Sequence, residues 1–154
     1  MRKLFISIAC LCAPYAVYAA PASTIALDKS AYHRNPAYER EYGYSAAVRS
    51  GDTLHVSGVA GRGPMPAALE RVYGNLRDIL AAHGLDFRHV VKETLYATDL
   101  DAVAANKAVR MRYLDGEQPA SSWIGVTRLV HPEAVLEVEI TAMFPPAMAA
   151  PTSR

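Results

Sequence analysis

The segment that decides the fold is YSAAVRSGDTLHVSG, residues 44–58. Residues 44–49 and 53–58 are predicted strands, because Gly51 and Asp52 between them are typical of a tight turn. The segment therefore predicts a β-hairpin. The glycines that follow it, together with Pro64, predict a loop over residues 58–64, since glycine permits backbone conformations and close approaches that other residues do not.

Helical periodicity begins just beyond this loop. Apolar residues recur every three or four positions through residues 67–83, and Gly84 lies where a helix C-cap is expected. Residues 90–97 are rich in β-branched side chains and predict a strand. A second helix is predicted over residues 102–113, opened by Asp99 or Asp101 as its N-cap.

Two further strands, residues 122–129 and 135–143, complete the predicted order ββαβαββ. This order predicts an α+β domain in which one mixed sheet carries both helices on one face. The other face would then need cover, and we expect apolar strand residues to lie on it. These residues are Val56, Leu95, Ile124 and Val138. Self-association through that face follows as a hypothesis.

The first nineteen residues have the pattern of a secretory signal peptide. Arg2 and Lys3 precede an apolar stretch, and small residues lead up to a cleavage site after Ala19. A membrane anchor is the alternative, but Pro14 breaks the apolar stretch well short of the roughly 20 residues that a spanning helix needs. We therefore expect an exported protein, periplasmic or fully secreted.

Two other segments flank the predicted domain. Residues 20–41 are polar and irregular and are expected to form an extended N-terminal arm. Residues 145–154 form a tail of proline, alanine and serine that is expected to be loose. The domain itself is predicted to span residues 42–144.

Charge and cysteine content exclude several kinds of chemistry. The chain has 16 basic and 15 acidic residues and two cysteines. Cleavage after Ala19 would remove Arg2, Lys3 and both cysteines, which leaves a nearly neutral, thiol-free protein. Such a protein has no disulfide or cysteine-based zinc site, and no electrostatic field to recruit nucleic acid.

Familiar catalytic and metal-binding motifs are absent from the sequence. There is no phosphate-binding loop, no nucleophile elbow and no zinc-protease motif. The histidines are dispersed without the spacing of metal ligands, and we expect them to be ordinary solvated or partly buried side chains. They are His33, His55, His83, His89 and His131. We predict no metal site.

Glu137 and Glu139 are two residues apart on the last predicted strand, so both side chains point to the same face. If that face is closed by a partner, burial would raise the pKa of a carboxyl group and suit it to hold a water or a substrate amine. The alternative is that this face is simply solvated at the edge of the sheet.

Several separated segments together resemble the Rid family, also called YjgF or L-PSP. They are YGYSAAVR with the following Gly-Asp and VSG, NLxxIL with Gly84, Thr98-Asp99-Leu100, Pro119-Ala120, and Leu136-Glu137-Val138-Glu139. The likeness covers residues 42–144. It implies a chorismate-mutase-like subunit and a homotrimer with three clefts between subunits. In well-known members these clefts hydrolyse 2-imino or 2-aminoacrylate-type acids to 2-oxo acids and ammonia, with no metal or organic cofactor.

The resemblance also implies roles for particular residues. Glu137 matches the acid that positions the attacking water, Tyr44 the cleft tyrosine, and Ser57 and Gly58 the cleft wall. An arginine that follows Pro-Ala holds the substrate carboxylate in the family, and here Ser121 occupies that position. A serine can donate one hydrogen bond but cannot neutralise a carboxylate. The departure makes the usual 2-imino acids doubtful substrates. Among the other arginines, Arg49, Arg62 and Arg128 are candidates to supply the charge.

Three functions remain at this point. The first is a hydrolytic deaminase for an imine or enamine, and the second is a non-catalytic exported trimer that binds a small ligand. The third, ribonuclease, attaches to some family members by name, but the neutral charge and the lack of a basic stripe or a catalytic histidine pair argue against it. The expected partners are a small molecule and further copies of the chain, without nucleic acid or, after signal cleavage, a membrane.

Overall fold

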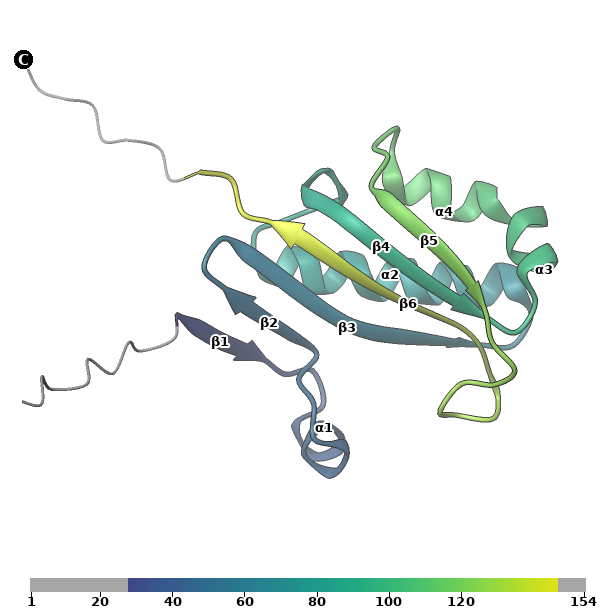
Figure 1. Ribbon diagram of the computed structural model, residues 1–154, viewed down its shortest axis with the longest axis horizontal. Helices are drawn as coiled ribbons and strands as arrows, with labels where there is room; N and C mark the ends of the chain where they lie inside the picture. The colour runs from purple at the N-terminus through teal and green to yellow at the C-terminus, as the bar shows by residue number, and fades with distance from the viewer. Residues whose placement is uncertain (1–27, 147–154) are drawn as a thin grey trace, which may run out of the picture.

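The computed structural model describes residues 28–146, which form a sheet with helices against it (Figure 1). The predicted signal peptide, residues 20–27 of the predicted arm and residues 147–154 of the tail lie outside the described residues. Among the described helices, none combines the length and the apolar character needed to cross a membrane.

The sheet has six strands in the order β1-β2-β3-β6-β4-β5. Their bounds are β1 Lys29–Tyr32, β2 Ala47–Ser50, β3 Thr53–Arg62, β4 Val90–Ala97, β5 Ala120–Gly125 and β6 Ala134–Met143. Neighbouring strands are antiparallel except β4 and β5, which run parallel. The predicted mixed sheet is therefore confirmed, with β5 as the edge strand that follows the helical crossover.

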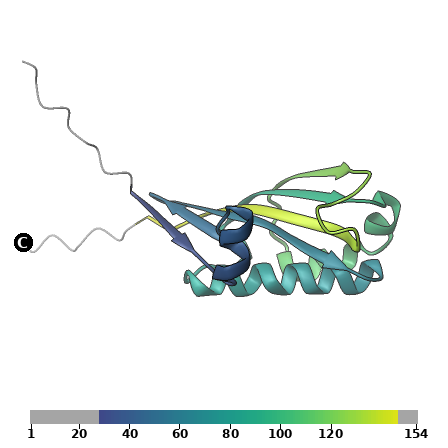
Figure 2. The ribbon, with the colours of Figure 1, turned by 90° about the horizontal axis from the view of Figure 1, so that it is seen from below.

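The helices that follow the hairpin cover one face of the sheet, as predicted. They are α2 Met65–Ala82, the short 3-10 turn η1 Phe87–His89, α3 Leu100–Ala105 and α4 Lys107–Leu114. Figure 2 shows α2 lying along this face. The periodic residues Leu69, Val72 and Leu76 of α2 have no exposed surface, because they pack against the sheet. The predicted second helix is divided at Asn106, and its N-cap is Asp99, whose side chain accepts from the N–H of Ala102 at 2.9 Å.

The predicted hairpin is present, but its second strand is longer than expected. β3 continues to Arg62, and its later residues pair with β6, so the loop predicted over residues 58–64 is wrong. Gly61 serves close packing there rather than a turn. A Cβ on Gly61 would come within 2.8 Å of the Ala68 carbonyl oxygen, so glycine lets α2 lie close to β3.

The expectation of an extended arm is also wrong for the part that the structure describes. Residues 29–32 form β1, which pairs with β2, and α1 follows at Pro36–Tyr42. Asn35 is the N-cap of α1 and accepts from the N–H of Tyr38, while Pro36 begins the helix with a backbone angle already suited to it. This local Asn-Pro signal outweighs the polar composition of the segment.

Three of the four apolar strand residues lie on the opposite face from the one predicted. Val56, Leu95 and Val138 are buried against the helices, and only Ile124 lies on the other side, where it is 41% exposed. We call this other side, opposite α2, the open face. It carries the alternate residues of the central strands, among them Glu137 and Glu139. The open face is therefore not the apolar surface that the sequence predicted, and the hypothesis of self-association loses this support.

Candidate functional site

The open face is polar where β4 and β6 meet. Their register places Tyr96 opposite Glu137 and Thr94 opposite Glu139. The Tyr96 hydroxyl donates to Glu139 Oε1 at 3.2 Å. The prediction that both acids share a face is confirmed, and Glu139 has a hydrogen-bond donor within the sheet.

Glu137 is seated on Gly58 of the neighbouring strand β3. A Cβ added to Gly58 would lie 1.9 Å from Glu137 Oε1, so only glycine leaves room for the carboxylate. Burial raises the pKa of Glu137, and the charge of Glu139 raises it further, while His131 acts in the opposite direction. A partly buried carboxyl with a raised pKa is better suited than a fully solvated one to accept and return a proton.

Tyr44 lies two residues after the end of α1, close enough to Glu137 for the charge of that carboxylate to act on it. Its side chain is 40% exposed, and burial together with the charges of Glu39 and Glu137 raises its pKa. The phenol therefore stays protonated and can donate to a ligand. Tyr38 of α1 packs edge-on against Tyr44, and its hydroxyl lies 2.6 Å from His131 Nε2.

The Ser57 hydroxyl is engaged in a hydrogen bond to the protein backbone. Its Oγ donates to the Ser45 carbonyl at 2.7 Å. The pairing of β3 with β6 shifts register between Val56 and Val59, so Ser57 and Gly58 form a bulge just beyond the start of β2. A cavity of about 360 Å³ opens there, and Tyr44, Ser57 and Gly58 line it.

Ser121 is separate from these residues. It lies on β5 opposite Glu93 of β4, on the helix side of the sheet, and its Oγ donates to Glu93 Oε1 at 2.8 Å. Glu137 projects from the open face. One chain thus brings together Tyr44, Ser57, Gly58 and Glu137 but does not bring Ser121 to them.

Sequence reasoning missed the charged group that surrounds Ser121. Glu93 is 1% exposed and accepts from Arg110 Nε at 2.9 Å and from the Tyr73 hydroxyl at 2.8 Å. Such a pairing is needed, because an unpaired buried carboxylate costs several kcal/mol. The sequence shows only that Glu93 is an acid within a β-branched strand, and its inward position is known from its burial in the structure.

The arginines named as candidates from sequence have other partners. The guanidinium of Arg49 stacks on Phe144 at 3.9 Å, and Arg62 pairs with Glu133 at 3.2 Å. The structure records no ion pair for Arg128 within residues 28–146. None of the three lines the cavity beside Ser121.

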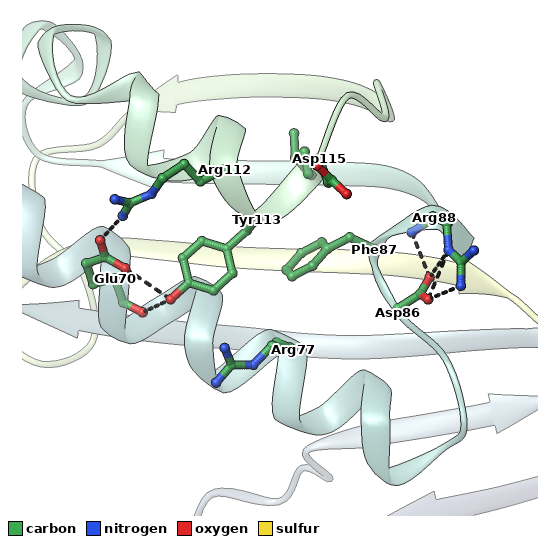
Figure 3. Close-up of a pocket in the computed structure, with 9 residues that line it drawn as sticks. Glu70, Arg77, Asp86, Phe87, Arg88, Arg112, Tyr113 and Asp115 are labelled. Atoms are coloured by element: carbon green, nitrogen blue, oxygen red, sulfur yellow. Dashed lines mark hydrogen bonds and ion pairs between the residues drawn. The ribbon is translucent and has the colours of Figure 1, made fainter.

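A cavity of about 490 Å³ lies on the outer side of the helices between α2, η1 and α4 (Figure 3). Its charged groups neutralise one another. Arg112 pairs with Glu70, and Arg88 pairs with Asp86 at 2.6 Å. The hydrogen bonds from Arg88 lower the pKa of Asp86 to about 2. No predicted site residue lines this cavity, so its size does not make it the candidate site. Residues 28–146 also contain no group of three or more acidic, histidine or cysteine side chains suited to a metal.

The fold defines the class of protein. A solved member of the YjgF/YER057c/UK114 family from Mycobacterium tuberculosis superposes with a TM-score of 0.69 at 26% identity, covering 75% of this chain and 98% of that one. Residues 35–144 match the family described as Endoribonuclease L-PSP, and the chain belongs to that family. The match begins at Asn35, so it includes α1.

Two curated relatives add names to this likeness. The 2-iminobutanoate/2-iminopropanoate deaminase of Mus musculus is 30% identical over 112 residues, which cover 67% of this chain and 82% of that protein. Protein DfrA of Myxococcus xanthus is 44% identical over 68 residues. That match covers 44% of this chain and only about half of DfrA, 52% of its length.

Proposed function

We propose that this protein is a hydrolytic deaminase of the Rid type, which converts an imine or enamine to a carbonyl compound and ammonia. The observation that carries the proposal is the carboxylate of Glu137, seated on Gly58 beside Tyr44 with a raised pKa. Family membership and the name of the mouse relative support the same reaction class.

In the proposed reaction, water adds across the carbon–nitrogen double bond. Glu137 takes a proton from the water as the water oxygen bonds to the imine carbon, and this proton passes to nitrogen to give a carbinolamine. Glu137 then takes the carbinol hydroxyl proton and delivers it to nitrogen, so that the carbon–nitrogen bond breaks, ammonia leaves and the carbonyl forms. The protonated phenol of Tyr44 is placed to donate to the substrate. These steps are proton transfers and one addition, so the proposal includes no metal or organic cofactor.

We further propose that the working unit is a homotrimer with its sites between subunits. Ser121 and Glu137 lie on opposite sides of one sheet, so a site that uses both must draw them from two copies. β5 is one of the two edge strands of the described sheet, and Met111 and Ile124 beside it are 57% and 41% exposed. An edge strand flanked by exposed apolar side chains favours contact with another chain.

Export is part of the proposal and rests on the first nineteen residues alone. The exported chain is expected to begin at Ala20, which N-terminal sequencing of the secreted protein tests. A protein recovered from outside the cell that begins at Met1 would contradict it.

The test of the reaction is ammonia release by the purified chain from a panel of imines and enamines formed in solution, with 2-iminobutanoate among them. Release well above the rate in buffer is expected for at least one of them. No release from any compound would overturn the proposal. RNA incubated with the same protein is expected to stay intact, and its cleavage would point to the ribonuclease in the family's description instead.

The position of Ser121 favours a second candidate, a non-catalytic trimer that binds a small ligand. The Ser121 hydroxyl is engaged with Glu93 and offers no charge to a substrate carboxylate. Native mass spectrometry of protein isolated from its own compartment distinguishes the two. A retained ligand without turnover supports the binding protein, and turnover without a retained ligand supports the deaminase.

A further inference from the structure

A cluster of four side chains behind β5 has no role in the proposed reaction so far. Glu93 of β4 lies at its centre and accepts hydrogen bonds from Tyr73 of α2, Arg110 of α4 and Ser121 of β5, at 2.8, 2.9 and 2.8 Å. Arg110 and Ser121 donate to the same oxygen, Glu93 Oε1. The guanidinium of Arg110 is therefore a direct neighbour of Ser121.

Arg110 has hydrogen-bond donors that the protein does not use. A guanidinium carries five N–H donors, and Glu93 takes only the one on Nε. Within residues 28–146 the structure records no hydrogen bond from either terminal nitrogen, and no buried side-chain nitrogen there lacks a partner. The terminal nitrogens are consequently accessible, although the side chain as a whole is only 14% exposed.

These nitrogens belong to a residue that lines a cavity. A hollow of about 340 Å³ lies between the end of α4 and the start of β5, and Arg110, Gln118, Pro119 and Ser121 are among its lining residues. Met111 and Leu114 add an apolar wall. The volume is ample for a small organic acid.

The charges around this cavity set the class of ligand. Glu93 binds the Nε side of Arg110, the Trp123 ring centroid lies 5.8 Å from the guanidinium carbon, and the Tyr73 hydroxyl is a further neighbour. The two terminal nitrogens keep N–H donors that can bind a carboxylate through two parallel hydrogen bonds. Glu117 also lines the cavity, but it is exposed and its charge is screened by solvent. Lys92 bonds to Ser122 at 2.9 Å on the other side of the sheet.

We propose that Arg110 binds the carboxylate of the substrate from α4, next to the position where the family resemblance expects an arginine and this chain has Ser121. The inference rests on the proposed function and specifies its substrate as a small 2-imino monocarboxylic acid. It replaces the expectation, drawn from Ser121 alone, that the usual 2-imino acids are not the substrates, because Arg110 supplies the charge that Ser121 lacks. The small side chain of Ser121 leaves room for the guanidinium, and their shared partner Glu93 fixes its orientation. In this proposal the residue that binds the carboxylate lies on α4, whereas the family resemblance expects it on β5.

The experiment measures binding of 2-oxobutanoate, the product expected from 2-iminobutanoate, to the purified chain by calorimetry. Its methyl ester is the uncharged comparison. The informative variant is the double change Glu93→Gln with Arg110→Gln, because it removes both charges together and leaves neither buried charge unpaired. It is expected to weaken 2-oxobutanoate binding about tenfold or more and to leave ester binding unchanged.

Two single variants complete the design. Glu93→Gln keeps Arg110 and one side-chain oxygen to accept from Arg110 and Ser121, while the Tyr73 hydroxyl must turn to accept from the new amide NH2. Because the change removes the neutralising charge, it is expected to tighten 2-oxobutanoate binding. Arg112→Gln changes an exposed arginine of the same helix that pairs with Glu70, and binding is expected to match the wild type. The Glu93→Gln result keeps the test decisive if the double variant does not fold.

Unchanged binding in the double variant, weaker binding in Glu93→Gln, or equal binding of acid and ester by the wild type would each overturn the role of Arg110. The two proposals fail separately. Arg110-dependent binding without ammonia release removes the deaminase and leaves the carboxylate site. Ammonia release from 2-iminobutanoate that the double variant retains in full removes the carboxylate site and leaves the deaminase.

Discussion

Glu137 shows at the residue scale how a single glycine can position a carboxylate. Gly58 of β3 lies close against the Glu137 side chain of β6, where any side chain on residue 58 would occupy the space of Glu137 Oε1. The same closeness removes water from the carboxylate and raises its pKa. The tight packing of the Glu137 carboxylate in the sheet therefore accounts both for its position and for its raised pKa.

Replacing Gly58 with alanine tests this link. The new Cβ would lie 1.9 Å from Glu137 Oε1, so the carboxylate must move, and ammonia release is expected to fall about 100-fold. Gly74→Ala is the matched control, because it lies in α2 with its nearest contact at 3.5 Å. It is expected to keep activity and to gain about 0.5–1 kcal/mol of stability from helix propensity. Full activity in Gly58→Ala would contradict the seating of Glu137.

The raised pKa of Glu137 has a consequence for stability. The folded protein holds this proton more tightly than the unfolded chain, so the stabilisation is complete below the ordinary pKa of a glutamate and is lost as pH rises through the raised value. Glu137→Gln abolishes this titration. We expect its melting temperature relative to wild type to increase from acidic to neutral pH, and a difference independent of pH would contradict the expectation.

At the element scale, α1 is the part of the fold that composition concealed. Glu39 is 2% exposed and accepts from the backbone N–H groups of Arg34 and Asn35, each at 2.9 Å. Burial acts to raise its pKa, yet these bonds and His33 outweigh burial and lower it. The buried Glu39 side chain thus holds the start of α1 in place through these hydrogen bonds. α1 in turn positions Tyr44 near Glu137.

Removing that acid is expected to loosen the segment. Glu39→Ala deprives the backbone of a charged acceptor, at a cost of about 2–3 kcal/mol for the docking of residues 29–42. Hydrogen exchange of those amides is expected to accelerate, with a smaller loss of ammonia release. Glu41→Ala, at an exposed position of the same helix, is the control and should exchange as wild type does. Unchanged protection in Glu39→Ala would show that other contacts hold α1.

The hairpin, α2 and β4 could be predicted because each carries a complete local signal. Val90–Ala97 has the predicted bounds, and α2 differs from them by one or two residues. The sidedness of the strands could not be derived in this way. Leu95 and Val138 alternate with polar residues on both neighbouring strands, and only the packing of α2 decides which set is buried.

The candidate site was predicted only in part for a similar reason. The resemblance supplied Tyr44, Ser57, Gly58 and Glu137, which lie near one another in the structure. Arg110 could not be found from spacing, because it joins Ser121 only through Glu93, and those three residues come from three elements. Contacts between distant segments of the chain have no local sequence pattern.

At the scale of the whole molecule, one chain carries the residues of the proposed site in two separate groups, which we call its two halves. Glu137 and its neighbours occupy the open face, whereas Ser121 and Arg110 lie behind the edge strand β5. A trimer would join the halves of adjacent copies. Analytical ultracentrifugation at micromolar concentration is expected to give the mass of three chains, and a monomer would leave each half without its counterpart.

The most direct test of the central claim compares the turnover number of Glu137→Gln with that of Glu139→Gln. The two acids share a strand and a face, but only Glu137 is seated on Gly58. With ammonia release as the readout, Glu137→Gln is expected to lower kcat about 100-fold or more, and Glu139→Gln to lower it by roughly a few-fold. A Glu137→Gln variant that turns over as fast as the wild type would contradict the account.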